Sequence, residues 1–313
     1  MSGPALQALA VLGAAITVDV LVGEYPRALH PVVWMGRVVR ALERRAPRAA
    51  RPVAQFAFGA VMALVVPGAF ALGSLAWLLF LRRWPAAAFL VEVYLLKASF
   101  AFAGLGQAAR GVSAALARGD LLAARGGLRS LCSRDPSALG EGELVAGAVE
   151  SVAENASDSF VAPLLFFVVF GVPGAVAYRA INTLDAIVGY RGHYEHLGKA
   201  SARLDDLANL VPARLTAALL LLAGALLGKD ITRGLATWRR DARSTESPNA
   251  GRPMSAMAGL LRVQLAKTGH YALGEPIEPL AAGTIAEAWR VVRVAGALHV
   301  VLVAVLLGGR DVL

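Results

Sequence analysis

Six long apolar runs constrain this chain more than any other feature of its sequence. Each is close to the roughly 20 residues that an α-helix needs to cross the hydrocarbon core of a bilayer. Only 17% of the residues are charged and the mean hydropathy is +0.58, whereas soluble domains carry about 25% charged residues. The chain is therefore expected to be an all-α, polytopic membrane helix bundle. The runs are 5–22, 53–81, 86–103, 161–177, 210–227 and 291–307.

Three of these runs carry residues that complicate a simple crossing. Run 53–81 is interrupted by Pro67-Gly68, and one kinked or tilted helix fits it better than two short ones. Run 86–103 contains Glu92 and Lys97, which favours packing inside the bundle. Run 161–177 contains two prolines and two glycines, which favours a re-entrant segment buried in protein. We expect about four to six membrane-embedded segments, some re-entrant, and amphipathic cytoplasm-facing helices, in a single integral membrane domain covering 1–313.

The basic residues predict an orientation and exclude one class of partner. The chain has 31 basic and 22 acidic residues, a net charge of +9, and segment 24–51 holds seven Arg against two Glu. By the positive-inside rule this segment lies in the cytoplasm, so the active site is expected on the cytoplasmic side of the cell membrane. Nucleic acid is a poor candidate partner because the Arg residues are dispersed between apolar runs. Arg110, Arg118, Arg125 and Arg129 fall near one helical face, which predicts an interfacial amphipathic helix touching lipid headgroups or bordering an anionic substrate.

Polar segments that lie directly against the apolar runs are the first candidates for function. A charged side chain at bilayer depth costs roughly 2.5 to 3.5 kcal/mol, so it persists only where it pairs, binds an ion or reaches water. Glu150, Glu154 and Asp158 recur at intervals of four, which places three carboxylates on one face of a helix. Mg²⁺ with substrate phosphates would offset their repulsion, and Asn155 adds an amide oxygen. The alternative is a helix face exposed to solvent.

Two further segments repeat this chemistry. Asn182 and Asp185 are three residues apart, and Asp205 and Asp206 each share a helical face with Asn209. Nearby guanidinium groups could hold phosphate or carboxylate, or could pair with these acids; they belong to Arg179, Arg191 and Arg203. No Walker A or G-x-G-x-x-G sequence occurs, so the common motifs do not reveal nucleotide binding. A single cysteine, Cys132, excludes an internal disulfide and a cysteine-based metal cluster.

Taken in order, these segments resemble the adenosylcobinamide-phosphate synthase family of cobalamin biosynthesis. The resemblance covers nearly the whole chain. It rests on Asp19, His30-Pro31 with Met35-Gly36, Ser133-Arg-Asp135, Glu150-Ser-Val-Ala-Glu-Asn-Ala-Ser-Asp158, Tyr178-Arg-Ala-Ile-Asn-Thr-Leu-Asp-Ala-Ile-Val-Gly-Tyr190, Ser201-Ala-Arg-Leu-Asp-Asp206 and Ser247-Pro-Asn-Ala-Gly251. The chain departs from the family where Gly23-Glu24-Tyr25-Pro26 replaces the usual Gly-Asp-Pro, which leaves a carboxylate role for Glu24 open.

The resemblance implies an ATP-dependent and Mg²⁺-dependent carbon-nitrogen ligase in the membrane. Such an enzyme joins the propionate carboxylate of adenosylcobyric acid to the amine of (R)-1-amino-2-propanol phosphate, or of a related amino alcohol. On this basis the catalytic residues are expected to be Glu154, Asp158 and Asp185. The expected substrate-binding residues are His30, Arg134, Asn155, Asn182, Arg191, Arg203 and Asn249. The expected magnesium ligands are Glu150, Glu154, Asp158, Asp205 and Asp206.

Two other functions stay open at this point. An intramembrane prenyltransferase also binds Mg²⁺-diphosphate through acidic and amide side chains at a membrane surface, and bound isoprenoid would favour it. An ion-coupled transporter would use broken helices and carboxylates near the middle of the membrane. The sequence shows no inverted repeat of the kind that many transporters have, and solute flux without ATP turnover would favour that class.

Overall fold

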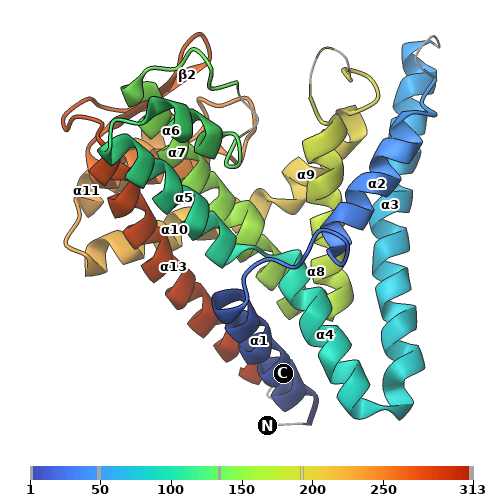
Figure 1. The fold of residues 1–313 in the computed structure, drawn as a ribbon. Coiled ribbons are helices and arrows are strands. Elements are labelled where there is room, and N and C mark those ends of the chain that lie inside the picture. Colours follow the sequence, from blue (N-terminus) through green and yellow to red (C-terminus); the bar gives the residue numbers. More distant parts are fainter. Residues whose placement is uncertain (1–2, 48–50, 133–134, 191, 193, 310–313) are drawn as a thin grey trace. The chain divides into compact units, whose positions relative to one another are not determined.

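The computed structural model describes residues 3–47, 51–132, 135–190, 192 and 194–309. Apart from one short β-hairpin, the regular elements in these ranges are helices, which confirms the predicted all-α class. The chain divides into two compact units (Figure 1). The first unit contains Met1–Ala101, Ala162–Ala208 and Val303–Leu313, and the second contains Phe102–Val161 and Asn209–Leu302. The expectation of a single integral domain stays a prediction.

The first unit is built from long apolar helices and two shorter polar ones. A single helix, α3, runs through Pro67, as predicted for run 53–81. The pairs α1 with α4, α2 with α8, and α3 with both α8 and α9 pack against each other. The helices are α1 (Gly3–Leu21), α2 (Pro31–Glu43), α3 (Pro52–Phe80), α4 (Pro85–Ser99), α8 (Ala162–Val188) and α9 (Lys199–Ala208), with a 3₁₀ turn at Leu81–Arg83.

The core of this unit lies where α2, α3 and α8 meet. Its buried side chains are Val39, Met62, Ala63, Val66, Leu184, Val188 and Leu197. Gly59 allows the chain before α9 to approach α3, because a Cβ at this position would lie 1.9 Å from the carbonyl oxygen of Leu197. This packing positions α8 and α9, which carry the predicted polar residues of the first unit.

Helix α8 is broken at Gly171, which adopts φ 68° and ψ −164°. This positive φ favours glycine, and Pro173 follows two residues later. The break falls inside run 161–177, where the proline and glycine content indicated irregular backbone. That this run is re-entrant stays a prediction.

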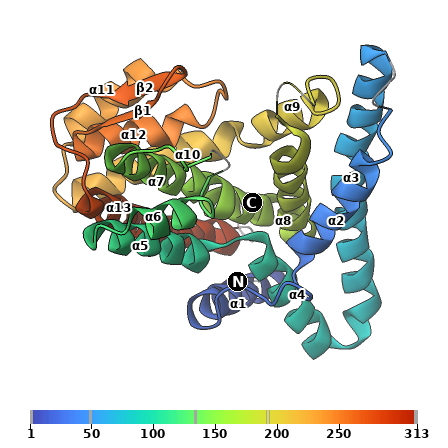
Figure 2. The same ribbon diagram turned by 45° about the horizontal axis from the view of Figure 1, so that its top comes forward.

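The second unit packs several helices around α12, which is buried along almost its whole length. Helices α7, α10 and α11 and the hairpin contact α12. The strands pair antiparallel with Gln264 opposite Gly274, and Figure 2 shows the hairpin beside α11 and α12. The elements are α5 (Phe102–Ala117), α6 (Leu121–Leu128), α7 (Glu141–Ala156), a π-helical turn (Ser157–Val161), α10 (Leu210–Leu226), α11 (Ile231–Asp241), α12 (Gly251–Leu261), β1 (Gln264–Lys267), β2 (Tyr271–Gly274) and α13 (Ala282–Gly309).

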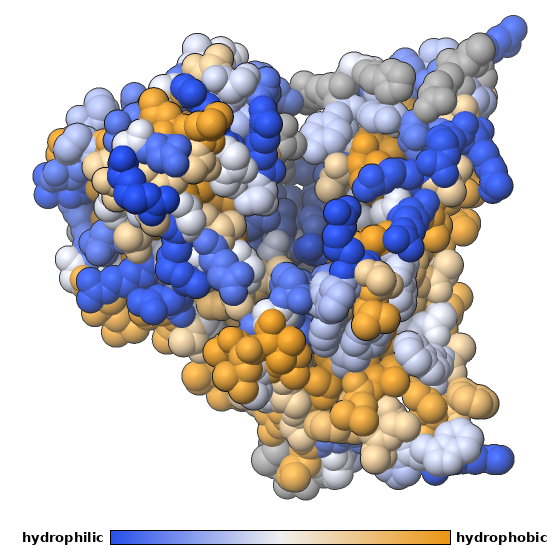
Figure 3. Space-filling view, viewed as in Figure 1, coloured by the Kyte–Doolittle hydropathy of each residue, from blue (hydrophilic) through white to orange (hydrophobic). Residues whose placement is uncertain are grey.

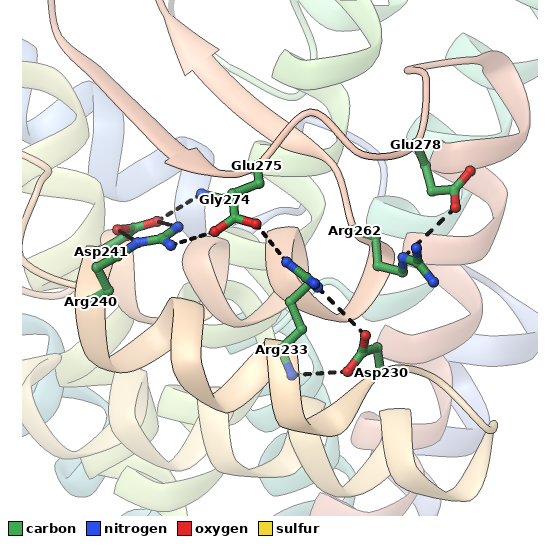
Figure 4. Close-up of polar contacts among 8 residues, drawn as sticks. All are labelled: Asp230, Arg233, Arg240, Asp241, Arg262, Gly274, Glu275 and Glu278. Atoms are coloured by element: carbon green, nitrogen blue, oxygen red, sulfur yellow. Dashed lines mark hydrogen bonds and ion pairs between the residues drawn. The ribbon is translucent and has the colours of Figure 1, made fainter.

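An ion-pair network ties the hairpin to α11 (Figure 4). The carboxylate of Glu275 accepts hydrogen bonds from Arg233 at 2.5 Å and from Arg240 at 2.6 Å. Arg240 also donates to the Asp241 carboxylate at 2.7 Å, and that carboxylate accepts the backbone N–H of Gly274 at 2.8 Å. The shared charges hold the end of β2 against the last turn of α11.

The predicted amphipathic helix carrying four Arg residues is divided in two. Gly119, with φ 72°, ends the α5 segment, and Asp120 caps α6 by accepting the backbone N–H of Ala123. Arg110 therefore lies on α5, Arg125 lies on α6, and the four residues do not form one helical stripe. The spacing could not reveal this turn, since a positive φ at glycine costs little and leaves the hydrophobic period almost unchanged.

Several helices are long and apolar enough to cross a membrane. Figure 3 shows apolar side chains gathered over α1, α4 and the adjoining part of α3, and exposed examples are Leu64, Leu72 and Leu90. In the described residues five such segments occur, or six if Lys199–Ala208 and Leu210–Leu226 count together, which agrees with the predicted four to six. The protein is a multi-pass membrane protein. The five segments are Gly3–Leu21, Pro52–Arg83, Pro85–Ala117, Glu141–Val188 and Ala282–Gly309.

Candidate functional site

The predicted site residues are distributed over both units. The first unit holds His30, Asn182, Asp185, Arg203, Asp205 and Asp206, and the second holds Glu150, Glu154, Asn155, Asp158 and Asn249. Arg134 and Arg191 lie outside the described residues. Each unit therefore presents its own polar side chains.

In the first unit, α8 and α9 bring three carboxylates together. Asp205 and Asp206 lie close enough to Asp185 to repel its charge. One oxygen of Asp185, Oδ1, is buried and has no hydrogen-bond partner among the described residues. Gly189 closes over this side chain, and a Cβ there would lie 1.9 Å from Asp185 Oδ1. A bound cation would reduce the repulsion between these carboxylates.

Two other predicted residues flank this acidic group. Asn182 lies one turn before Asp185 on α8, and its Oδ1 accepts a hydrogen bond from Arg179 at 3.3 Å. Arg203 forms an ion pair of 3.9 Å with Asp206, but its side chain is 77% exposed. An exposed pair of this kind contributes little, so Arg203 retains the freedom to contact a ligand.

A second cluster in the first unit surrounds the buried side chain of Lys97. Its ammonium group contacts Asp19 and Glu24, each at 3.1 Å, and donates to the carbonyl of Phe100 at 3.3 Å. Three acceptors match the three N–H groups of a lysine, which explains how a fully buried ammonium is tolerated. The two charges of run 86–103 favoured packing of this run inside the bundle, and the structure buries the part of the run that carries Lys97, while the run still belongs to one of the segments long and apolar enough to span a membrane.

Glu24 connects this buried lysine to His30. Its Oε2 lies 3.0 Å from His30 Nε2, while His30 Nδ1 accepts the backbone N–H of Val32 and caps α2. In the neutral form of His30 the proton is therefore on Nε2, and this N–H group donates a hydrogen bond to the Glu24 carboxylate. Burial acts to raise the pKa of Glu24, but the hydrogen bond from His30 and the charge of Lys97 outweigh it and hold this pKa below 4.5. The sequence left the role of Glu24 open, because only the fold brings Lys97 to it.

In the second unit, the predicted acidic face lies on α7 and the turn that follows. Glu150 is 4% exposed and lies two helical turns before Asp158, which falls inside the π-helical turn Ser157–Val161. A π turn inserts an extra residue into the helical repeat, and such turns are frequent at functional sites. Asn155 donates to the carbonyl of Ser151 at 2.9 Å and accepts from Ser159 at 3.2 Å. The π turn has no signature that the spacing of four could reveal.

Among the described residues, no three His, Cys, Asp or Glu side chains are arranged closely enough to hold a metal ion by themselves. The five predicted magnesium ligands also belong to different units. This arrangement still fits Mg²⁺, because that ion usually takes one or two carboxylates and completes its octahedron with phosphate oxygens and water. Asp185, Asp205 and Asp206 of the first unit could supply one or two such carboxylates, and magnesium binding there stays a prediction.

Asn249 lies among guanidinium groups in the second unit. It is 5% exposed, and its Oδ1 lies 3.4 Å from Arg214 Nη1. Arg252 follows at the start of α12 and donates to the carbonyl of Pro248 at 3.4 Å. Burial lowers the pKa of Arg252, and the charges of Arg214 and Arg243 lower it further. Three cations close to a buried amide form an environment that attracts an anion.

These features define a class of protein: a multi-pass membrane protein whose helices carry clusters of carboxylates, amides and guanidinium groups suited to anionic ligands. Residues 12–303 match the protein-family model described as CobD/Cbib protein. The chain belongs to this family.

Curated relatives from distant organisms agree with this assignment. Cobalamin biosynthesis protein CobD of Dehalococcoides mccartyi is 42% identical over 305 residues, which cover 95% of this chain and 96% of the relative. The protein of the same name from Geobacter metallireducens is 42% identical over 91% of both chains. The probable cobalamin biosynthesis protein CobD of Methanothermobacter thermautotrophicus is 37% identical over 87% of this chain and 89% of the relative. No solved structure matches the chain.

Proposed function

We propose that this protein acts in cobalamin biosynthesis as an adenosylcobinamide-phosphate synthase. It joins the propionate carboxylate of adenosylcobyric acid to the amine of (R)-1-amino-2-propanol phosphate, or of a related amino alcohol, with ATP and Mg²⁺. The observation that carries this proposal is the family match, because residues 12–303 include every polar cluster described above and the curated relatives are named for cobalamin biosynthesis.

The proposed reaction has two chemical steps. In the first, a propionate oxygen attacks the γ-phosphorus of ATP, the bond between the γ-phosphorus and its bridging oxygen breaks, and ADP leaves with formation of an acyl phosphate. In the second, the neutral amine attacks the acyl carbon, inorganic phosphate leaves and the amide forms. The ammonium group of the free substrate must lose a proton before this attack, so a carboxylate base is required.

The acidic clusters support this chemistry. Asp185 is our candidate for the base in the first unit, since one of its oxygens is buried without a hydrogen-bond partner in the described part of the chain. Glu154 and Asp158 are the candidates in the second unit. Asp205 and Asp206 in the first unit, and Glu150 in the second, are each candidates to hold magnesium, which when bound neutralises the charge on the phosphates.

The remaining polar side chains suit substrate binding. Asn155 and Asn249 present amide groups to the amide and carboxylate groups of the corrin substrate, and the guanidinium groups beside Asn249 suit an anion. We assign His30, Asn182 and Arg203 of the first unit to the amine substrate. Since segment 24–51 is rich in arginine, the reaction is assigned to the cytoplasmic face.

A direct assay tests the proposal. The purified protein in detergent is incubated with adenosylcobyric acid, aminopropanol phosphate, ATP and Mg²⁺, and the corrinoid products are analysed by mass spectrometry. We expect an amide-linked corrinoid whose formation stops when ATP or Mg²⁺ is left out, together with one ADP per amide. Failure to form this product with folded protein, or its formation without ATP, would contradict the proposal. Copurifying isoprenoid, or solute flux without ATP turnover, would favour a prenyltransferase or a transporter.

A further inference from the structure

The first unit contains a pocket lined by arginines between α2 and α8. Its volume is about 520 Å³. Arg37 and Arg40 lie three residues apart on α2, Arg27 comes from the segment before that helix, and Arg179 comes from α8. Asn182 also lines it, and Figure 3 shows hydrophilic side chains gathered over α2. Four guanidinium groups from three segments thus face one small space.

The charges that Arg27, Arg37 and Arg40 bring to this pocket are not balanced by acids of the described residues. None of the residues that line it is acidic. Within the described ranges, none of Arg27, Arg37 and Arg40 has an ion pair, whereas Arg233 and Arg240 elsewhere in the chain share Glu275. Like charges at such spacing repel each other. An anion in the pocket would turn this repulsion into attraction.

We propose that this pocket binds the phosphate monoester of the amine substrate, an inference that rests on the proposed function. A phosphate monoester carries a charge of about −1.5 to −2 at pH 7 and offers three acceptor oxygens, which several guanidinium forks can bind in pairs. A lipid phosphodiester carries a single charge and offers fewer free oxygens. Most of the rest of the lining is apolar, with Val32, Gly36 and Ala186 among its members.

Asp185 lies close in sequence to the residues of α8 that line the pocket. Asn182 lines the pocket, and Asp185 follows three residues later on α8, a rise of about 4.5 Å along the helix. In an aminopropanol phosphate, two carbons separate the amine from the ester oxygen, so its charged ends lie at about this distance. Asp185 does not itself line the pocket, so this spacing shows only that its backbone lies within one helical turn of a lining residue.

Direct binding tests the pocket without requiring catalysis. Isothermal titration with (R)-1-amino-2-propanol phosphate, in the absence of ATP and corrinoid, compares the full-length protein with Arg37→Gln and Arg40→Gln. Loss of one charged hydrogen-bonding group is expected to raise Kd by about 10- to 100-fold. The matched control is Arg44→Gln, because Arg44 is exposed at the end of the same helix, belongs to the same basic segment and does not line the pocket. Its Kd should change less than about threefold.

A second probe separates the phosphate from the rest of the ligand. Unphosphorylated 1-amino-2-propanol should bind weakly and equally to the parent protein and the pocket variants, because it lacks the group that the arginines contact. Size-exclusion chromatography and thermal unfolding confirm that each variant is folded. Arg37 and Arg40 are exposed, so both variants are expected to fold.

Several results would overturn the proposal. These are an unchanged Kd in both pocket variants, an equal loss of binding in Arg44→Gln, or an effect of the pocket variants on ATP binding alone. Weaker binding of aminopropanol phosphate in nanodiscs that contain phosphatidylglycerol, relative to phosphatidylcholine alone, would assign the pocket to a lipid headgroup instead. If Arg37→Gln still forms the amide with an unchanged KM for the amine substrate, the phosphate-binding role of the pocket is refuted and the proposed ligase activity is retained. Intact pocket-dependent binding without amide formation would refute the ligase and still support the phosphate site.

Discussion

The buried ion pair between Lys97 on α4 and Asp19 on α1 allows a quantitative test of what stabilises the first unit. We consider Lys97→Met, which keeps most of the volume of the side chain and removes its charge. Lys97 is fully buried and Asp19 is 1% exposed, so the substitution removes the cation that pairs with the buried Asp19 carboxylate. At 3.1 Å and an effective dielectric constant of about 20, one such ion pair is worth about 5 kcal/mol before desolvation is subtracted.

Removal of one partner of a buried pair typically costs about 3 to 5 kcal/mol, and we expect Lys97→Met to lower the free energy of unfolding by this amount. Asp19→Asn should cost a similar amount, because it leaves the ammonium group underpaired. The double variant should be more stable than the sum of the two single changes predicts, by at least about 2 kcal/mol, since neither charge then remains buried alone. Glu24 is 37% exposed, so Glu24→Gln should cost only about 1 kcal/mol.

Reversible unfolding in mixed detergent micelles, followed by tryptophan fluorescence and by circular dichroism, measures these differences. The four proteins of the cycle are compared at neutral pH and at one protein concentration. A cost below about 1 kcal/mol for Lys97→Met would refute the reasoning, and so would strict additivity of Lys97→Met and Asp19→Asn. Either result would mean that water or another group satisfies Asp19 when the lysine is absent.

Four further outcomes are expected. Because the pKa of Glu24 is held below its usual 4.5, its stabilising contribution is complete above pH 4.5 and is lost as the pH falls through the folded pKa; unfolding measured between pH 7 and 3 should show this loss in the parent protein and not in Glu24→Gln. Asp185→Asn should reduce amide formation at least 100-fold in the mass-spectrometric assay while leaving the unfolding temperature within a few degrees; full activity would remove Asp185 as the base. Gly189→Ala should reduce activity about tenfold or more, because its Cβ would displace the Asp185 carboxylate, and an unchanged rate would show that this carboxylate can move freely. Glu275→Gln should lower the unfolding temperature slightly at low salt and have no effect at high salt, and a decrease that does not depend on salt would exclude an electrostatic cause.

Much of the fold could be predicted from the sequence, because it depends on features that are local along the chain. Apolar runs of membrane length, the polar segments beside them and the continuous helix through Pro67 all follow from composition and spacing along the chain. The break in α8 was also indicated, because proline and glycine act on the backbone where they stand. The turn at Gly119 was not predicted, since it alters the direction of the helix with almost no change in the hydrophobic pattern.

The candidate site was predicted only in part. Spacing identified the carboxylates on α7 and the pair Asn182 and Asp185, because helical periodicity determines which neighbours share a face. The π turn around Asp158 was missed, since it depends on how one extra residue is packed.

What the sequence determines by itself is therefore the membrane class, the order of the helices and the family, all of which are encoded in residues close together along the chain. Only the tertiary structure decides that Glu24 lies between Lys97 and His30, and that arginines from α2 and α8 face one pocket. The physical reason is that electrostatic and hydrogen-bonding partners interact over a few ångströms in space. For Glu24 and Lys97 that short distance joins residues 73 positions apart in the chain.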